Sequence, residues 1–144
     1  MRRLSSKLKA IGARQAFILP DTGSEADRGR PHLQICLTDP CEKGDILCVS
    51  VGTYESGMDK TCLLKAGDHS YIVHLSTIYY GTPRKMPAAA TLKRINDGEL
   101  TEQGLISEPI FLRVCKGMLT SDFRVPTVEE YAKAQWKRMG LKVE

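Results

Sequence analysis

A guanidinium at the entrance of a strand is the first sign of chemistry in this chain of 144 residues. Arg30 is followed by Pro31 and the apolar run HLQICL, and it ends a loop rich in turn-forming residues. Proline biases the residue before it towards an extended backbone, so Arg30 should be held with little freedom. Its planar fork of donors suits a phosphate. The alternative, which the residues by themselves favour, is an ion pair with Glu25 or Asp27 that only orders the loop.

A threonine ends the next strand-like run, DILCVSVGT. The hydroxyl of Thr53 can donate a hydrogen bond to a phosphate oxygen or accept one from it. A threonine in this position can also do no more than cap a turn, and Thr53 alone favours that role. Arg30 and Thr53 together are candidates for one phosphate-binding surface, and the functional interpretation depends on their convergence.

The loop and the two apolar runs resemble the PemK/MazF family of toxin endoribonucleases. Chains of that family run from a first strand into a flexible loop of the form G-S-E…R-P, followed by two strands, the second of which ends at Thr or Ser. The matching residues here are Gly23-Ser24-Glu25, Arg30-Pro31, HLQICL and DILCVSVGT. The resemblance covers roughly residues 14–86. The chain departs from the family in its short loop, in a first strand without the usual Gly-Asp or Gly-Glu start, and in a longer helical segment beyond residue 86.

The resemblance implies an α+β fold, a small SH3-like β-barrel with C-terminal helices that usually forms a homodimer. It implies the toxin of a type II toxin–antitoxin system, a hydrolase that cleaves single-stranded RNA without a metal or other cofactor and is inhibited by a cognate antitoxin protein. The ribose 2′-hydroxyl attacks the adjacent phosphorus and the 5′-oxygen leaves, so the protein supplies charge stabilisation and proton transfer but no nucleophile. By this resemblance Arg30 and Thr53 would be catalytic. The residues expected to contact the substrate are Ser24, Glu25, His32 and Tyr54.

The group that accepts the 2′-hydroxyl proton stays open in the sequence. Histidine is the side chain best suited to exchanging protons near neutrality, and the chain has three, His32, His69 and His74. The last two can equally lie in a turn and at a strand end, solvated or holding backbone groups. Loop carboxylates and tyrosines are further candidates: for proton transfer, Glu55 and Asp59, and for stacking on unpaired bases, Tyr54, Tyr79 and Tyr80.

Two interpretations without catalysis stay open. A barrel that has lost its activity could serve as a protein- or nucleic-acid-binding module, with Arg30 in a structural role and the helical half as an interface. The chain could also be a basic nucleic-acid-binding protein without chemistry, because its net charge is +4 and its N-terminal segment reads RRLSSKLK.

The composition is typical of a single globular domain, with 42% apolar and 26% charged residues. No segment approaches the length of a membrane span, and the basic N-terminus lacks the apolar core of a secretory signal. The five cysteines are irregularly spaced and form no C-x-x-C pair. This spacing argues against a disulfide framework and a zinc site, and it favours a reducing cytoplasm.

Strand-like runs fill the first part of the chain and helix-like runs the second. Strands are expected at 14–20, 31–37, 45–53, 61–65 and 70–74, with 76–80 as an extension of the last, and together they give a β-barrel core over 14–86. Helices are expected at 88–97, 107–117 and 125–140, within a helical extension over 87–144 of the same domain. The residues expected to mark helix ends are Gly98, Ser107, Pro109, Gly117, Thr127, Glu130 and Gly140. The similar segments KRINDGELT and LRVCKGMLT are expected to form two similar helix–turn units on the sheet.

Overall fold

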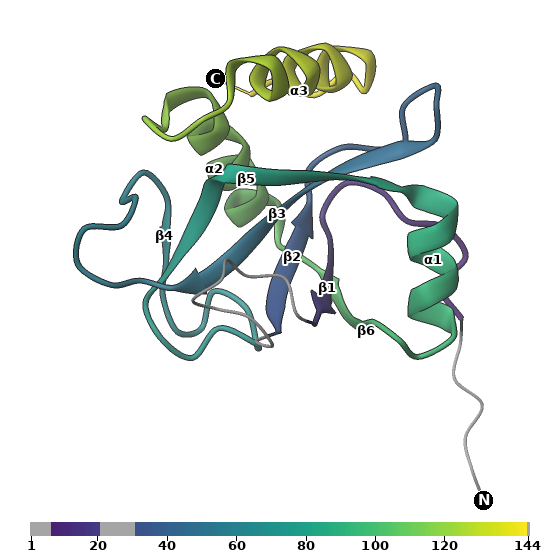
Figure 1. Ribbon diagram of the computed structural model, residues 1–144, viewed down its shortest axis with the longest axis horizontal. Helices are drawn as coiled ribbons and strands as arrows, with labels where there is room; N and C mark the ends of the chain where they lie inside the picture. The colour runs from purple at the N-terminus through teal and green to yellow at the C-terminus, as the bar shows by residue number, and fades with distance from the viewer. Residues whose placement is uncertain (1–6, 21–30, 144) are drawn as a thin grey trace, which may run out of the picture.

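Six strands form one antiparallel sheet that curls into a half-barrel, and three helices pack around it (Figure 1). The computed structural model describes residues 7–20 and 31–143. The strands are β1 (Gln15–Leu19), β2 (His32–Cys36), β3 (Asp45–Thr53), β4 (Leu63–Leu64), β5 (Ser76–Pro87) and β6 (Thr101–Leu105), and the helices are α1 (Ala88–Asn96), α2 (Glu108–Thr120) and α3 (Pro126–Arg138). Their order in the sheet is β4-β5-β3-β2-β1-β6. The expected α+β class is therefore confirmed.

The central strands are buried on both faces, and each face packs against different helices. Alternation along β2 turns Leu33 and Ile35 to one face, where they join an apolar cluster that includes residues of α2 and α3. Cys36 points to the other face and joins a second cluster with Phe17 of β1 and Ile95 of α1. Burial of both faces makes β2 and β3 the rigid centre from which the site is built.

A polar strip occupies the part of the second face that the α1 cluster leaves uncovered. His32 and Gln34 lie two residues apart on β2, and Gln34 is paired with Ser50 of β3. The Gln34 side-chain amide donates to the Ser50 hydroxyl across 2.7 Å. The alternation in HLQIC thus separates an apolar face from a polar one, but the polar residues are buried rather than solvated.

Two hydrogen bonds fasten the C-terminal helices to the sheet. The indole N–H of Trp136 in α3 donates to the Leu37 carbonyl oxygen at 2.9 Å, and the Tyr80 hydroxyl of β5 donates to the Val114 carbonyl oxygen of α2 at 2.7 Å. Gly117 lets α2 come this close, because a Cβ atom at that position would lie 2.0 Å from the Tyr80 hydroxyl oxygen. Figure 1 shows α2 and α3 on the same side of the sheet, and α1 at the far end of β5.

Some expected helix ends are wrong. The helix expected at 107–117 continues through Gly117 to Thr120. The helix expected to begin with a Thr127–Glu130 capping box begins at Pro126, with Val125 in the N-cap position and no side-chain cap. Proline suits the first helical position because its missing N–H has no partner there anyway, so Pro126 starts the helix earlier.

The two similar segments fold differently. In KRINDGELT the helix ends before Gly98, which adopts φ +87° as a C-terminal glycine often does, and the chain then enters β6. In LRVCKGMLT the matching Gly117 lies inside α2. The expectation of two similar helix–turn units is therefore wrong. β6 also pairs with β1, so the sheet includes residues from the segment expected to be helical.

A histidine joins the connection between β4 and β5 to β6, the strand at the opposite end of the sheet order. The His69 Nδ1 accepts from the Tyr71 N–H at 2.9 Å, and its Nε2 donates to the Gln103 carbonyl oxygen of β6 at 2.9 Å. The strand expected at 70–74 does not form, because this connection turns at His69 and only Ile72 of its apolar residues enters the core. The expected strand at 61–65 is reduced to β4, and β5 begins at Ser76.

All five cysteines are free thiols, four of them buried and Cys41 partly exposed.

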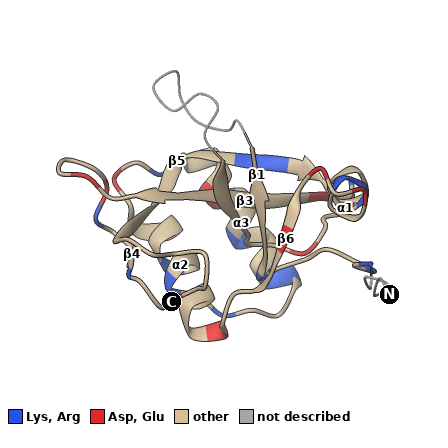
Figure 2. Cartoon of the chain, turned by 90° about the horizontal axis from the view of Figure 1, so that it is seen from below, with Lys and Arg blue, Asp and Glu red and all other residues tan. Residues whose placement is uncertain are grey.

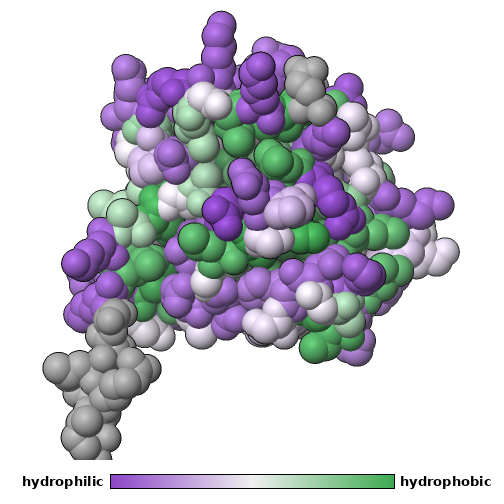
Figure 3. Space-filling view, turned by 180° about the vertical axis from the view of Figure 1, so that it is seen from behind, coloured by the Kyte–Doolittle hydropathy of each residue, from purple (hydrophilic) through white to green (hydrophobic). Residues whose placement is uncertain are grey.

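Within residues 7–20 and 31–143, no helix has the length and apolar character needed to cross a membrane. Figure 3 shows apolar side chains gathered in a band across the middle of the rear face, below the more polar end of the molecule that carries α3.

Candidate functional site

A cavity of about 520 Å³ opens where β2, β3 and β5 meet the β4–β5 connection. Its wall includes His32 at the start of β2, Thr53 at the end of β3 and His74 in the connection. Ser76 and Tyr79 of β5 are also part of the wall. This Thr53 cavity brings together residues that are far apart in the chain.

Strand register brings Thr53 to the end of the loop that precedes β2. Thr53 is exposed and is paired with Ser76 of β5. On the other side of β3, Leu33 of β2 lies opposite Val51. This antiparallel register, continued by two residues, sets Pro31 level with Thr53. Pro31 accordingly lines the Thr53 cavity.

Three residues expected to act on RNA lie outside the described residues, namely Ser24, Glu25 and Arg30. The convergence of the Arg30 guanidinium with the Thr53 hydroxyl therefore stays a prediction. The part of the chain that the structure describes begins again one residue later, with Pro31 at the edge of the cavity.

Two of the three histidines line the Thr53 cavity. His32 is 7% exposed, and its ring centroid lies 5.9 Å from that of Tyr79, with the ring planes tilted by 60°. His74 is exposed to solvent. Two imidazoles on one cavity can provide one group that removes a proton and another that supplies one.

The third histidine has a structural role. The Nδ1 of His69 accepts a backbone N–H and its Nε2 donates to a carbonyl oxygen, so both ring nitrogens are engaged. His69 is not among the residues that line the Thr53 cavity. Of the alternatives considered for this residue, the one in which it holds backbone groups in a turn is confirmed.

The two loop carboxylates differ in their surroundings. Burial disfavours the charge of Asp59, but hydrogen bonds from the hydroxyls of Ser121 and Thr61 outweigh it and hold the pKa of Asp59 below its ordinary value. Its oxygens accept from Ser121 Oγ at 2.5 Å and from the Thr61 N–H at 2.8 Å. Asp59 therefore ties the loop after β3 to the end of α2. Glu55 is exposed and lines the Thr53 cavity.

The three candidate tyrosines also differ in their surroundings. Tyr54 follows Thr53 but does not line the Thr53 cavity, and its N–H donates to the Leu75 carbonyl oxygen at 2.8 Å. Its expected contact with the substrate stays a prediction. Tyr80 is buried with its hydroxyl bonded to α2, and this burial raises its pKa. Of the three candidate tyrosines, Tyr79 lies in the wall of the Thr53 cavity, as does Tyr71 of the β4–β5 connection.

A second cavity of about 560 Å³ adjoins the first and shares His32, Met58 and Tyr79 with it. We call it the aromatic cavity, because Tyr79, Tyr80 and Phe123 are part of its wall; its polar wall residues include Ser50, Asp59, Thr82 and Arg84. Sequence reasoning missed this cavity. A polar Ser50 inside the otherwise apolar run DILCVSVGT is the signal that could have indicated it.

The charged residues in the walls of the two cavities are Glu55, Asp59 and Arg84. Figure 2 shows a basic stretch of β5, which contains Arg84 and Lys85, with further basic residues on α2 and α3. Arg84 lines the aromatic cavity. Among the described residues, no group of three or more His, Cys, Asp or Glu side chains is placed to hold a metal ion.

The sequence and the structure were compared with models of protein families, with curated proteins and with solved structures, and no match was found.

Proposed function

We propose that the protein is an endoribonuclease that cleaves single-stranded RNA by attack of a ribose 2′-hydroxyl on the adjacent phosphorus. One observation carries the proposal: His32, His74 and Thr53, from three different elements, line one cavity beside Pro31, the residue after Arg30. Two proton-transfer groups and a hydroxyl donor on one concave surface are the side chains that this reaction needs.

The reaction forms the 2′-oxygen–phosphorus bond and breaks the bond between phosphorus and the 5′-oxygen. One imidazole of the His32 and His74 pair takes the proton of the 2′-hydroxyl, and the other gives a proton to the departing 5′-oxygen. Arg30 and Thr53 stabilise the negative charge that develops on the non-bridging oxygens. The products are a 2′,3′-cyclic phosphate and a 5′-hydroxyl, and DNA is not cleaved because it lacks the nucleophile.

The finer parts of the resemblance belong to the same proposal. The curled antiparallel sheet is compatible with an SH3-like barrel of the PemK/MazF type, and the family likeness extends to a homodimeric toxin held inactive by an antitoxin protein. Controlled expression in bacteria tests this biological role: wild-type protein should arrest growth with RNA breakage, and co-expression of a small protein encoded beside it should relieve the arrest. Harmless expression would remove the toxin role.

Cleavage of a short single-stranded RNA by the purified protein in the presence of a chelator tests the chemistry. Arg30→Ala, His74→Ala and Thr53→Ala should each lower the cleavage rate, by about a hundredfold or more where a charge-stabilising donor is lost. Arg28→Ala, in the same loop, and Thr101→Ala, an exposed threonine at the start of β6, serve as matched controls. A single 2′-deoxy substitution at the cleaved nucleotide should abolish the reaction.

Mass spectrometry of the products identifies the mechanism. A 2′,3′-cyclic phosphate end agrees with the proposal, and a 5′-phosphate end contradicts it. If the folded wild-type protein leaves RNA intact, or if Arg30→Ala and His74→Ala cleave as fast as their controls, the enzyme interpretation fails and a non-catalytic binding module remains.

A further inference from the structure

The aromatic cavity contains a phenylalanine that the fold leaves on the surface. Phe123, in the turn between α2 and α3, is 55% exposed and lines the cavity together with Tyr79 and Tyr80 of β5. A phenyl ring that is more than half exposed contributes little to the stability of the core. It gives the cavity a π face that is open to a ligand.

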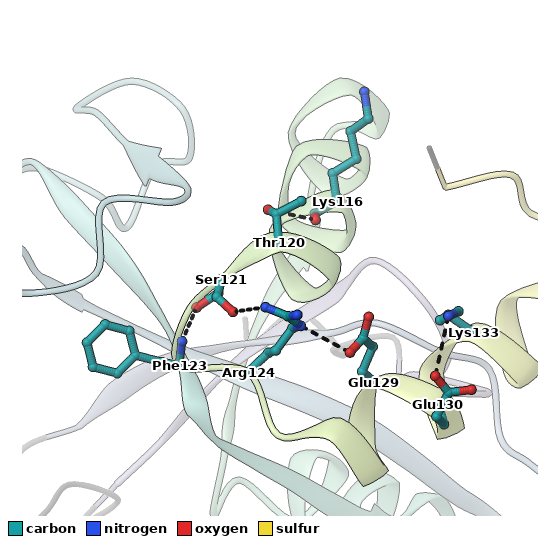
Figure 4. A network of polar contacts seen from close by, with 8 residues as sticks. All are labelled: Lys116, Thr120, Ser121, Phe123, Arg124, Glu129, Glu130 and Lys133. Carbon is teal, nitrogen blue, oxygen red and sulfur yellow. Dashed lines mark hydrogen bonds and ion pairs between the residues drawn. The ribbon is translucent and has the colours of Figure 1, made fainter.

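The turn that carries Phe123 is held in place by several hydrogen bonds (Figure 4). The fully buried Ser121 accepts from the Phe123 N–H at 2.9 Å and donates to Asp59 at 2.5 Å. Arg124 donates to the Ser121 carbonyl oxygen at 2.7 Å and bonds to Glu129 at 3.1 Å. The Phe123 backbone is therefore positioned before any ligand arrives, and this lowers the entropic cost of binding.

Buried polar groups lie on the same sheet face as the cavity. Ser50 lines it, and Ser50 accepts a hydrogen bond from Gln34, which is 0% exposed. Gln34 itself is not part of the wall, so its role is to orient the Ser50 hydroxyl from behind. The polar groups of the wall, among them those of Ser50, Asp59 and Arg84, suit a flat ligand that has both donors and acceptors at its edge.

The position of the aromatic cavity beside the Thr53 cavity indicates the chemical class of that ligand. His32, Met58 and Tyr79 belong to the walls of both cavities, so the two cavities lie side by side and a chain molecule can place neighbouring groups in each of them. A nucleobase is flat, stacks on aromatic rings and carries donors and acceptors at its edge. In single-stranded RNA, the base next to a bound phosphate can turn out of the stack into such a cavity.

We infer that the aromatic cavity binds one unstacked base of the RNA strand whose phosphate lies in the Thr53 cavity, with the base stacked against Phe123. The inference rests on the proposed ribonuclease function for the identity of the strand. It adds a base-binding subsite to which the turn between α2 and α3 contributes Phe123.

An uncleavable probe separates binding from catalysis. Single-stranded DNA oligonucleotides with one 2-aminopurine, moved along the strand position by position, are titrated with protein at constant salt concentration. Wild-type protein should bind and quench the fluorescence strongly at one position. Phe123→Ala should lose this quenching and weaken binding by about 5- to 150-fold, the range for one base stacked on an aromatic ring.

Three further variants keep the test decisive. Phe123→Tyr should bind like wild type, and Leu105→Ala, which removes an equally exposed apolar side chain from β6, should have no effect. Should Phe123→Ala fail to fold, Phe123→Leu makes the same comparison, because it keeps an apolar side chain without a π face. The inference is overturned if wild-type protein does not bind the probes, or if a folded Phe123 variant without an aromatic ring binds and quenches like wild type.

The two proposals fail in different ways. Quenching that depends on Phe123 in a protein that does not cleave RNA leaves the base site standing and removes the enzyme. Cleavage of RNA by a protein whose probe binding is independent of Phe123 leaves the enzyme standing and removes the base site.

Discussion

Gly52 and Gly117 allow a paired test of how packing positions the site, because a methyl group at either position meets a tyrosine. A Cβ atom on Gly117 would lie 2.0 Å from the Tyr80 hydroxyl oxygen, and one on Gly52 would lie 2.0 Å from that of Tyr79. In both variants the tyrosine must move. Tyr80 is 1% exposed and its hydroxyl is bonded to the Val114 carbonyl oxygen, whereas Tyr79 is less buried and faces two cavities.

The cost of Gly117→Ala follows from what Tyr80 loses. Overpacking a filled core costs about 1–3 kcal/mol. Breaking the bond from the buried Tyr80 hydroxyl to the Val114 carbonyl oxygen, 2.7 Å long, adds about 1–3 kcal/mol. Alanine returns about 1 kcal/mol through its higher helix propensity. The expected net loss of unfolding free energy is therefore about 1–5 kcal/mol.

Gly52→Ala should behave differently. Tyr79 can swing into the cavities, and alanine is favoured over glycine in a strand interior by about 0.5–1 kcal/mol, so Gly52→Ala should lose less unfolding free energy than Gly117→Ala. The displaced ring should nevertheless impair nucleic-acid binding. Urea denaturation measures both free energies. If Gly117→Ala is as stable as wild type, or Gly52→Ala is the less stable of the two, the argument from burial is wrong.

Three other predictions concern the surroundings of the site. His69→Ala should lower the unfolding free energy by about 1–3 kcal/mol and accelerate hydrogen exchange at the Tyr71 amide, because both ring nitrogens of His69 are bonded to backbone groups; unchanged exchange would contradict this. The pKa of Asp59 is held below the ordinary 3.8, so its contribution to stability is complete above that value and is lost as the pH falls through the depressed pKa. Asp59→Asn should therefore lose less stability than wild type in urea denaturation between about pH 5 and about pH 2. The Tyr131 hydroxyl beside the Cys41 thiol lowers the pKa of that thiol, so iodoacetamide should alkylate Cys41 before the four buried cysteines, and Tyr131→Phe should slow the reaction.

Local patterns in the sequence predict the strands and helices that contain their own signals. The runs HLQICL and DILCVSVGT gave β2 and β3 because apolar and β-branched residues fit a strand buried on both faces. Gly98 marks the end of α1 because its backbone conformation, φ +87°, is readily available only to glycine. These features depend on a few neighbouring residues, which a single sequence provides.

Features that depend on distant partners could not be predicted. Gly117 reads as a helix end in the sequence, yet α2 passes through it, and the position requires glycine because Tyr80, 37 positions earlier, occupies the space of a Cβ atom. His69 reads as a possible acid or base, yet its partner Gln103 lies on β6, and only the curl of the sheet brings the two together. Phe123 carries no signal at all, because its role depends on a cavity formed by β3 and β5.

The Thr53 cavity depends on the register of β2 against β3 more than on the sequence motifs at its edge. At the closed end of the β2–β3 hairpin, the Leu37 N–H donates to the Leu47 carbonyl oxygen, and the Leu47 N–H donates to the Thr38 hydroxyl. These bonds align the two strands far from the site, and the alignment sets Pro31 level with Thr53 at the open end. A slip of one residue would turn every β2 side chain to the opposite face of the sheet and remove His32 from the cavity. Residues without any chemistry of their own therefore decide whether the groups that we propose to bind the phosphate can meet.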